Sequence, residues 1–234
     1  MKDIYKIAFL TSGYGSIAET LIQAIEKNII PCAQAVCVIS DRQSKSLELG
    51  NKYSVACHHV DFHSAGSREA FSDKILELFL KYEIDFAFST FDRLVSGKLI
   101  DVYKNKLINL HPSLTPAFRG IDPLRKSVEY GCKIIGATCH FIDESIDGGP
   151  IINQCILAIS PESDFDMIEH ALFPLRQAIA LESVYAMVKN LVTIDGRIVR
   201  MRNADYASLP INPKIKDFNL PPGNVFNLKH PKRN

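Results

Sequence analysis

The stretch KIAFLTSGYGSIAETLIQAIEK, residues 6–27, decides the fold, because three local patterns follow one another in it. Residues 6–10 form a mostly apolar run that is typical of a buried strand, and residues 11–16 contain the two glycines of a turn. Residues 18–27 carry apolar side chains at the spacing of an amphipathic helix. A strand, a turn and a helix in this order predict the beginning of a parallel α/β sheet.

The same alternation continues through the first half of the chain. Further strands are predicted at residues 35–40, 55–60 and 85–89, and helices at residues 44–53, 67–82 and 97–103. Strands that are separated by helices imply right-handed βαβ connections. The predicted fold class is therefore α/β, with a Rossmann-like, mostly parallel twisted sheet that is flanked by helices.

The second half is less regular and predicts a C-terminal antiparallel extension. Residues 134–141 and 151–159 have the pattern of an antiparallel strand pair, and a long helix is predicted at residues 165–192. An Asp-Gly-Arg turn at residues 195–197 connects two short strands.

Prolines become frequent after residue 203, and we expect an extended, partly disordered and solvated tail there. The predicted organisation is a catalytic domain at residues 1–203, with halves at residues 1–105 and 106–203, and a Pro-rich tail at residues 204–234.

The composition excludes several classes of function. The net charge of the 234 residues is +1, so no general attraction to nucleic acid or to an anionic membrane is expected. No apolar run reaches the length of a membrane span and the first residues do not resemble a signal peptide, so we expect a cytoplasmic protein. We also expect a monomer or homodimer that acts on small molecules. The six cysteines include no Cys-x-x-Cys pair, so buried thiols are expected rather than disulfides or a metal site.

Two short segments carry residues that suit acid–base chemistry. Asn109 and His111 lie two residues apart after the strand-like residues 106–108, so their side chains share one face in extended structure. Asp147 begins an Asp-Gly-Gly-Pro turn after the strand-like residues 137–142. If the two segments meet, an amide, an imidazole and a carboxylate form a compact site for acid–base work on an acyl group.

The residues around these segments resemble the folate-dependent formyltransferase family. The resemblance is carried by INLHPSLTP at residues 108–116, GATCHFID at residues 136–143 and DGGPII at residues 147–152. Members of the family move a formyl group from 10-formyltetrahydrofolate to an amine, so the resemblance implies this co-substrate and no metal. It also implies that Asn109 and His111, together with Asp147, are the catalytic residues.

This resemblance predicts a direct transfer. Asn109 would donate to the formyl oxygen, and the loss of such a donor typically raises a barrier by ~3–4 kcal/mol. A protonated His111 would donate to the same oxygen or give a proton to the leaving folate nitrogen. Asp147 would stabilise the imidazolium, or hold a water that relays the amine proton. Direct transfer, without a covalent enzyme intermediate, is the simplest scheme.

Other segments resemble the glycinamide ribonucleotide transformylases of this family, which act in purine synthesis, and so imply that acceptor. The glycine loop before the first helix lets the backbone approach a phosphate, and the helix start offers free N–H groups. Ile17 stands where these enzymes usually have Asn, and the stretch before Glu169 is shorter than usual. The implied acceptor- and phosphate-binding residues are Gly13, Tyr14, Gly15, Ser16, Ile17 and Glu169.

The same resemblance implies a folate site. Arg68 and Arg93 would bind the glutamate tail, and the segment FDRLV at residues 91–95 would contact the pterin ring through its backbone. The loop at residues 142–147 would lie on the other side of the ring. The implied folate-binding residues are Arg68, Arg93, Leu94, Val95, His140, Ile142, Asp143 and Glu144.

Three alternatives stay open. The segment FRGIDP at residues 118–123 resembles methionyl-tRNA and sugar-amine formyltransferases, so the acceptor could be another small amine such as an amino sugar or a hydroxyornithine. KIIGAT at residues 133–138 resembles formyltetrahydrofolate hydrolases. The first alternative is thus a related enzyme that acts on another small amine. The second alternative is a non-catalytic folate-binding homologue. The third is a dinucleotide-dependent oxidoreductase, in which Asp41 would end the second strand, although the third glycine of that motif is missing.

Overall fold

The computed structural model describes residues 2–218 and divides them into two compact units. Unit 1 comprises residues 2–109 and 142–144, and unit 2 comprises residues 110–141 and 145–218. The part of the predicted tail at residues 219–234 lies outside the described residues.

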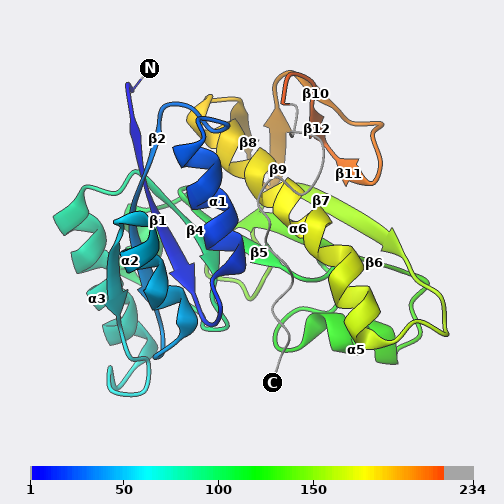
Figure 1. Cartoon of the computed structure of the whole chain (residues 1–234), viewed down its shortest axis with the longest axis horizontal. Coiled ribbons are helices and arrows are strands. Elements are labelled where there is room, and N and C mark those ends of the chain that lie inside the picture. Colours follow the sequence, from blue (N-terminus) through cyan, green and yellow to red (C-terminus); the bar gives the residue numbers. More distant parts are fainter. Residues whose placement is uncertain (1, 219–234) are drawn as a thin grey trace. The chain divides into compact units, whose positions relative to one another are not determined.

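Unit 1 contains a parallel sheet whose strands lie in the order β3-β2-β1-β4-β5, and Figure 1 shows them in blue to green. The strands are β1 (Tyr5–Thr11), β2 (Ala33–Ser40), β3 (Ala56–His59), β4 (Phe86–Thr90) and β5 (Leu107–His111), of which the last two residues belong to unit 2. The helices are α1 (Ser16–Glu26), α2 (Leu49–Tyr53), α3 (Arg68–Tyr82) and α4 (Lys98–Val102), with a 3-10 helix η1 (Lys45–Glu48). The predicted parallel α/β sheet is confirmed.

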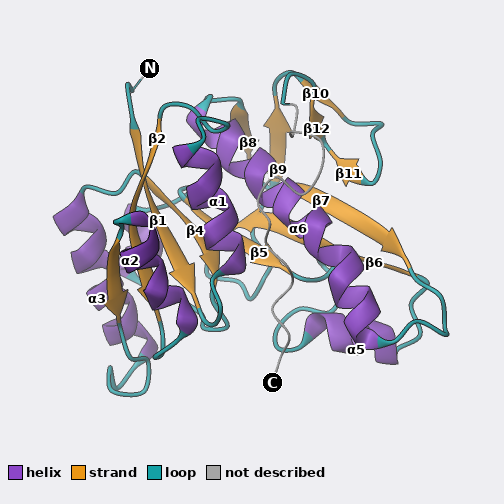
Figure 2. Cartoon of the chain, in the orientation of Figure 1, coloured by secondary structure: helices purple, strands orange, loops and turns teal. Residues whose placement is uncertain are grey.

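Helices α3 and α4 supply one side of the core of unit 1, and Figure 2 shows helices alternating with the strands. Phe71 and Phe79 on α3 and Leu99 on α4 are fully buried against Ala8 and Leu10 of β1. Burial of one large apolar side chain contributes about 1.5–3 kcal/mol to stability. The core therefore fixes β1 and β4, whose carboxyl ends carry the loops predicted to bind substrates.

The helix predicted at residues 44–53 is wrong in its first part, because residues 45–48 are 3-10 helix. The hydroxyls of Ser44 and Ser46 are 2.8 Å apart, and Thr11 Oγ1 donates to Ser46 Oγ at 2.6 Å. Short polar side chains that bond locally compete with the α-helical backbone, which accounts for the later start of α2.

Unit 2 contains a predominantly antiparallel group of strands and a long helix. Strand β6 (Ile134–Phe141) pairs antiparallel with β7 (Ile151–Ala158), and β8 (Val192–Asp195) forms a hairpin with β9 (Ile198–Met201). The helices are α5 (Pro123–Glu129) and α6 (Phe165–Val188). The predicted antiparallel extension is confirmed, but α6 ends before the predicted residue 192. Asn190 ends it with a left-handed backbone, φ +52°, and its N–H donates to the Met187 carbonyl at 3.0 Å.

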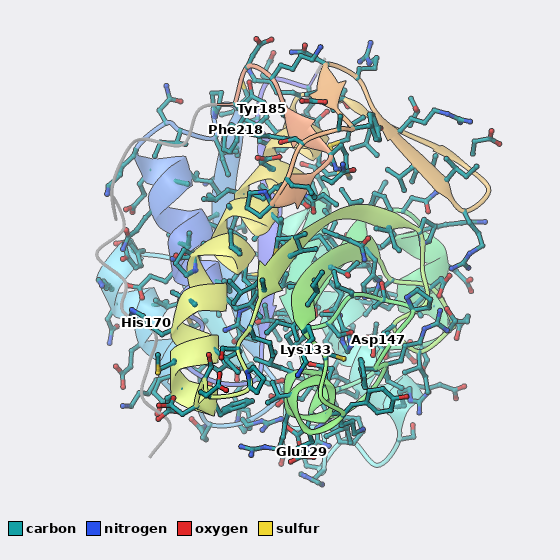
Figure 3. The ribbon with its side chains drawn as sticks, turned by 90° about the vertical axis from the view of Figure 1, so that its right-hand side faces the viewer. Glu129, Lys133, Asp147, His170, Tyr185 and Phe218 are labelled. Carbon is teal, nitrogen blue, oxygen red and sulfur yellow. The ribbon has the colours of Figure 1, made fainter. Side chains whose placement is uncertain are left out.

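The prediction of a solvated tail is wrong for residues 204–218. Strand β10 (Ala204–Asp205) pairs with β12 (Lys214–Ile215), and β11 (Ile211–Asn212) pairs with β7. Ile215 N donates to the Glu182 carboxylate at 3.2 Å, and the rings of Phe218 and Tyr185, labelled in Figure 3, have centroids 4.5 Å apart. Ile215 and Phe218 are buried, so apolar burial offsets the entropy lost in ordering this proline-rich segment.

The thiols are free, and three of them are deeply buried. Burial raises the pKa of Cys37 to about 12 and that of Cys155 to about 11, and it also raises the pKa of Cys139. These three cysteines are therefore neutral at pH 7. The expectation of buried thiols is wrong for Cys32, which lies exposed in the loop before β2. Within residues 2–218, none of the helices combines the length and the apolar character needed to span a membrane.

Candidate active site

His111 and Asp147 lie against each other in unit 2. His111 is the last residue of β5, and Asp147 lies in the loop between β6 and β7, where Figure 3 labels it. Nδ1 of His111 is 3.4 Å from Oδ2 of Asp147, and only 5% of His111 is exposed. An imidazole and a carboxylate thus meet in a nearly water-free place, where their interaction is stronger than at the surface.

The second nitrogen of His111 also faces an oxygen atom. Nε2 lies 3.0 Å from the carbonyl oxygen of Phe118, so this nitrogen carries the hydrogen and donates. With a carboxylate at Nδ1 and a carbonyl at Nε2, both nitrogens face acceptors. The ring of His111 is therefore oriented by an acceptor on each side.

A second imidazole faces the same carboxylate. His140 on β6 is 3% exposed, and its Nε2 is 3.9 Å from Oδ1 of Asp147. The resemblance assigns His140 to folate binding, whereas the structure places its ring against Asp147. Asp147 Oδ2 also accepts the backbone N–H of Gly120 at 2.9 Å. The hydrogen bond from Gly120 therefore directs Oδ2, while His140 lies near Oδ1 beyond hydrogen-bond distance.

The loop that follows His111 is tied to the neighbouring strands. Thr138 Oγ1 on β6 donates to the carbonyl of Ser113 at 2.7 Å and accepts the N–H of Thr115 at 3.2 Å. Gln154 on β7 donates to Thr138 Oγ1 at 2.9 Å and to the carbonyl of Thr115 at 3.2 Å. These bonds fix the segment that carries the Phe118 carbonyl to His111.

Asn109 precedes this pair on the same strand. It pairs in register with Ser89 of β4 and lies in unit 1, two residues before His111. Alternate residues of a strand point to one face, so β5 presents Asn109 and His111 on the same face.

The glycine loop of unit 1 lies between β1 and α1, as predicted. Gly15 has φ +72°, and a Cβ added there would lie 2.6 Å from Cβ of Ser46, so the sharp turn requires glycine. The first helical bond joins Glu19 N to the Gly15 carbonyl at 2.8 Å, which leaves the amides of residues 16–18 without acceptors inside the helix. The Ile17 side chain is buried, so only its backbone could contact an acceptor.

Gly13 connects this loop to the 3-10 helix η1, because its carbonyl accepts the Ser46 N–H at 3.2 Å. Nζ of Lys45 lies 5.0 Å from the centre of the Tyr14 ring, so a cation stands beside the loop. The loop of Gly13, Tyr14, Gly15 and Ser16 thus combines backbone donors with a nearby positive charge, which favours an anion.

Arg93 is held by a buried acid in unit 1. Its Nε lies 3.4 Å from Oδ2 of Asp41, and its guanidinium stacks on the Phe62 ring at 4.8 Å. Arg42 donates to both oxygens of the same carboxylate, at 2.9 and 2.7 Å, and the bond to Asp41 raises the pKa of Arg42. The Asp41 side chain has no exposed surface, so this carboxylate is not available for the ribose of a dinucleotide.

The remaining folate residues of unit 1 fall into two groups. Val95 is buried in the hydrophobic core and can offer a ligand only its backbone, whereas Ile142 packs against this core and is partly exposed. Arg68 and Glu144 are exposed, and Leu94 and Asp143 are partly exposed. Arg68 begins α3, directly after Ser67, whose hydroxyl caps the helix by accepting Ala70 N at 3.0 Å.

Glu169 lies on α6 and is occupied by an ion pair. It is 5% exposed, and Oε2 accepts a hydrogen bond from Nη2 of Arg176 at 2.6 Å. An acceptor hydroxyl would have to compete with this guanidinium for the carboxylate. Within residues 2–218, no group of three or more His, Cys, Asp or Glu side chains is placed to hold a metal ion.

A parallel α/β sheet whose strand β5 ends in an imidazole paired with a carboxylate defines an α/β enzyme with an acid–base site. The comparisons with known proteins specify it further. The family model described as formyl transferase matches residues 5–183, and the chain belongs to this formyltransferase family.

Individual relatives agree with this assignment. Phosphoribosylglycinamide formyltransferase of Bacillus subtilis is 31% identical over 193 residues, which covers 82% of this chain and 97% of the relative. The Escherichia coli protein of the same name is 28% identical over 199 residues, with 82% and 94% covered. The crystal structure of glycinamide ribonucleotide transformylase 1 from Symbiobacterium toebii superposes with a TM-score of 0.82 at 29% identity, covering 86% of this chain and 95% of that one.

Several residues that shape the site escape reasoning from the sequence. The Gly120 amide and the Phe118 carbonyl act through the backbone, so their side chains give no signal. Thr138 and Gln154 are polar residues inside strands, and that unusual placement is a signal that could identify them. Arg197, which donates to the Gly148 carbonyl, is expected only as part of a turn.

Proposed function

We propose that the chain transfers a formyl group from 10-formyltetrahydrofolate to the primary amine of glycinamide ribonucleotide. The observation that carries the proposal is the contact of His111 with Asp147 at 3.4 Å, in a family whose members move formyl groups. The names of the relatives support the acceptor, and they match this chain over nearly their whole length. The resemblance of residues 108–152 to folate-dependent enzymes supports the donor.

In the proposed reaction, the acceptor nitrogen forms a bond to the formyl carbon, and the formyl oxygen becomes negative. The side-chain amide of Asn109 donates to this oxygen. The Nε2 hydrogen of His111, which otherwise points to the Phe118 carbonyl at 3.0 Å, turns to the same oxygen. Donors that are fixed in advance stabilise such a charge more than water does.

The collapse of this intermediate breaks the bond between the formyl carbon and the folate nitrogen. The leaving nitrogen takes a proton from His111, and the acceptor nitrogen loses one, so the proton balance of the whole reaction is zero. Asp147 stabilises the imidazolium before the transfer, and it directs the amine proton back to the imidazole through a water. The buried thiols of Cys139 and Cys155 are neutral, which agrees with a transfer without a covalent enzyme intermediate.

The test is the release of tetrahydrofolate, followed by its absorbance, with glycinamide ribonucleotide as the acceptor. Rapid turnover that falls by orders of magnitude in His111→Ala and in Asp147→Asn is the expected result. His170→Ala is the matched control, because this histidine is exposed on α6 (Figure 3). Near-normal rates in both site variants, with circular dichroism spectra like the wild type, would remove the proposed mechanism.

A second candidate acceptor is another small amine, such as an amino sugar. Two observations favour it: Arg176 occupies the Glu169 carboxylate that would bind the ribose hydroxyls, and Ile17, which is buried, stands where the transformylases usually have Asn. The same assay with an amino sugar or a hydroxyornithine decides between the acceptors by their kcat/KM values. Tight folate binding without turnover of any of these amines would instead support a non-catalytic folate-binding protein.

A further inference from the structure

The loop that carries Asp147 is held by an arginine from another part of unit 2. Arg197 follows Gly196 in the turn between β8 and β9, and its Nη2 donates a hydrogen bond to the carbonyl oxygen of Gly148. Gly148 directly follows Asp147 in the chain. The β8–β9 hairpin is therefore connected to the catalytic loop through one charged donor, which makes the bond stronger than one between neutral groups.

This loop has a backbone that needs support. Asp147 has φ +45°, in the left-handed region that side chains other than glycine rarely adopt. Gly148 is closely packed, because an added Cβ would lie 2.5 Å from Ser145 Oγ and 3.2 Å from Nη1 of Arg119, and these side chains would have to move. A strained residue followed by a tightly packed one keeps its conformation only where outside contacts hold it.

The position of the loop determines the geometry of the site. Asp147 reaches His111 at 3.4 Å and the Gly120 amide at 2.9 Å with the same oxygen, Oδ2. A rotation of the backbone at residues 147 and 148 would move this oxygen away from both partners. The Arg197 bond acts on the carbonyl that such a rotation would displace.

We propose that Arg197 is a positioning residue that keeps the Asp147 carboxylate directed at His111. The proposal rests on the proposed function only for its effect on catalysis. Arg197 contacts the Gly148 carbonyl and acts on the reaction through the backbone of the Asp147 loop. The turn between β8 and β9 thus contributes to formyl transfer through the conformation of the Asp147 loop.

The kinetic test compares Arg197→Met, which keeps an unbranched chain without donors, with Arg197→Lys, which keeps a cation. In Arg197→Met we expect kcat to fall about 10- to 100-fold while KM for each substrate changes less than about threefold, since misplacing a catalytic group acts on the chemical step. Arg197→Lys should recover part of the lost kcat, because its ammonium can still donate to the Gly148 carbonyl. The recovery should be incomplete, because the ammonium donates with a different geometry. Arg200→Met is the control, since Arg200 lies on the same hairpin and pairs with exposed Asp195 at 3.2 Å.

A second readout does not depend on activity. The N–H of Gly120 is protected by its bond to Asp147, so its hydrogen exchange, measured by NMR, should become faster in Arg197→Met. The amides of Ala137 and Cys139 in the buried strand β6 should keep the wild-type rate. Faster exchange at all three amides would show general destabilisation and overturn the proposal.

A double-variant cycle completes the test. In the Asp147→Asn background, Arg197→Met should lower kcat by less than about twofold, because the carboxylate that it positions is already lost. Equal fold-losses in both backgrounds would overturn the proposal. If the wild type transfers no formyl group to any amine, the proposed function fails, and the exchange rate of Gly120 alone decides whether Arg197 holds the loop.

Discussion

Replacing Glu182 by Gln should stabilise the protein at neutral and alkaline pH. Glu182 lies on α6 with 1% of its surface exposed, and its carboxylate accepts the Ile215 N–H at 3.2 Å. Burial raises the pKa of Glu182 from 4.5 to about 7, although the Ile215 N–H and the positive charge of Lys214 act in the opposite direction. The glutamine carbonyl still accepts the Ile215 N–H, so the substitution removes the charge and keeps the hydrogen bond.

The size and sign of the effect follow from proton linkage. A tenfold change in proton binding corresponds to about 1.4 kcal/mol, so a pKa that rises from 4.5 to about 7 corresponds to about 3 kcal/mol. The folded state binds this proton more tightly than the unfolded chain does. The contribution of Glu182 to stability is therefore greatest below pH 4.5, decreases as the pH rises to about 7, and stays low above that value.

The assay is urea denaturation followed by circular dichroism, at several values between about pH 5 and about pH 8. The free energy of unfolding of Glu182→Gln minus that of the wild type should increase through this range by up to about 3 kcal/mol. Glu129→Gln is the control, because Glu129 is exposed on α5 (Figure 3). Parallel curves for the wild type and Glu182→Gln would refute the reasoning, since they would mean that folding does not change proton binding at this carboxylate.

Two further substitutions test the packing around the site. Gly15→Ala should lower the free energy of unfolding by at least about 1 kcal/mol, because φ at Gly15 is +72° and the new Cβ would lie 2.6 Å from Cβ of Ser46. The measurement is a thermal melt, and Gly13→Ala is the control, because Gly13 has open space around it. Thr138→Val should lower the free energy of unfolding by about 1–3 kcal/mol and also lower kcat, because the Ser113 carbonyl loses its hydrogen-bond donor. An unchanged melting temperature and kcat would argue against a role for the Thr138 hydroxyl.

Much of the fold could be predicted because local chemistry and tertiary packing agree. The apolar run of β1, the glycine turn and α1 follow one another as the sequence indicates. Ser67 caps the start of α3 and Asp164 caps the start of α6, each by accepting a backbone N–H of the first turn. In these places, side chains a few residues apart carry the whole signal.

The errors arise where distant residues decide the local structure. The segment 204–218 has the composition of a solvated tail, but Glu182 and Tyr185 on α6 provide partners for it. For the site, the motifs identify His111 and Asp147, but only the fold brings their side chains to 3.4 Å. The ion pair between Arg93 and Asp41 could not be predicted either, because it forms only where the fold brings the loop after β2 next to the loop after β4.

The short strand β11 has a consequence for solubility. The Ile211 and Asn212 positions pair with Cys155 and Gln154 of β7, and Ile156 N donates to the Pro210 carbonyl at 2.9 Å. The segment therefore covers backbone groups of β7 that could otherwise pair with a strand of another molecule. Strand β11 thus protects β7 from edge-to-edge aggregation. A chain shortened to residue 203 would expose this part of β7, so we expect it to aggregate more readily during expression and storage.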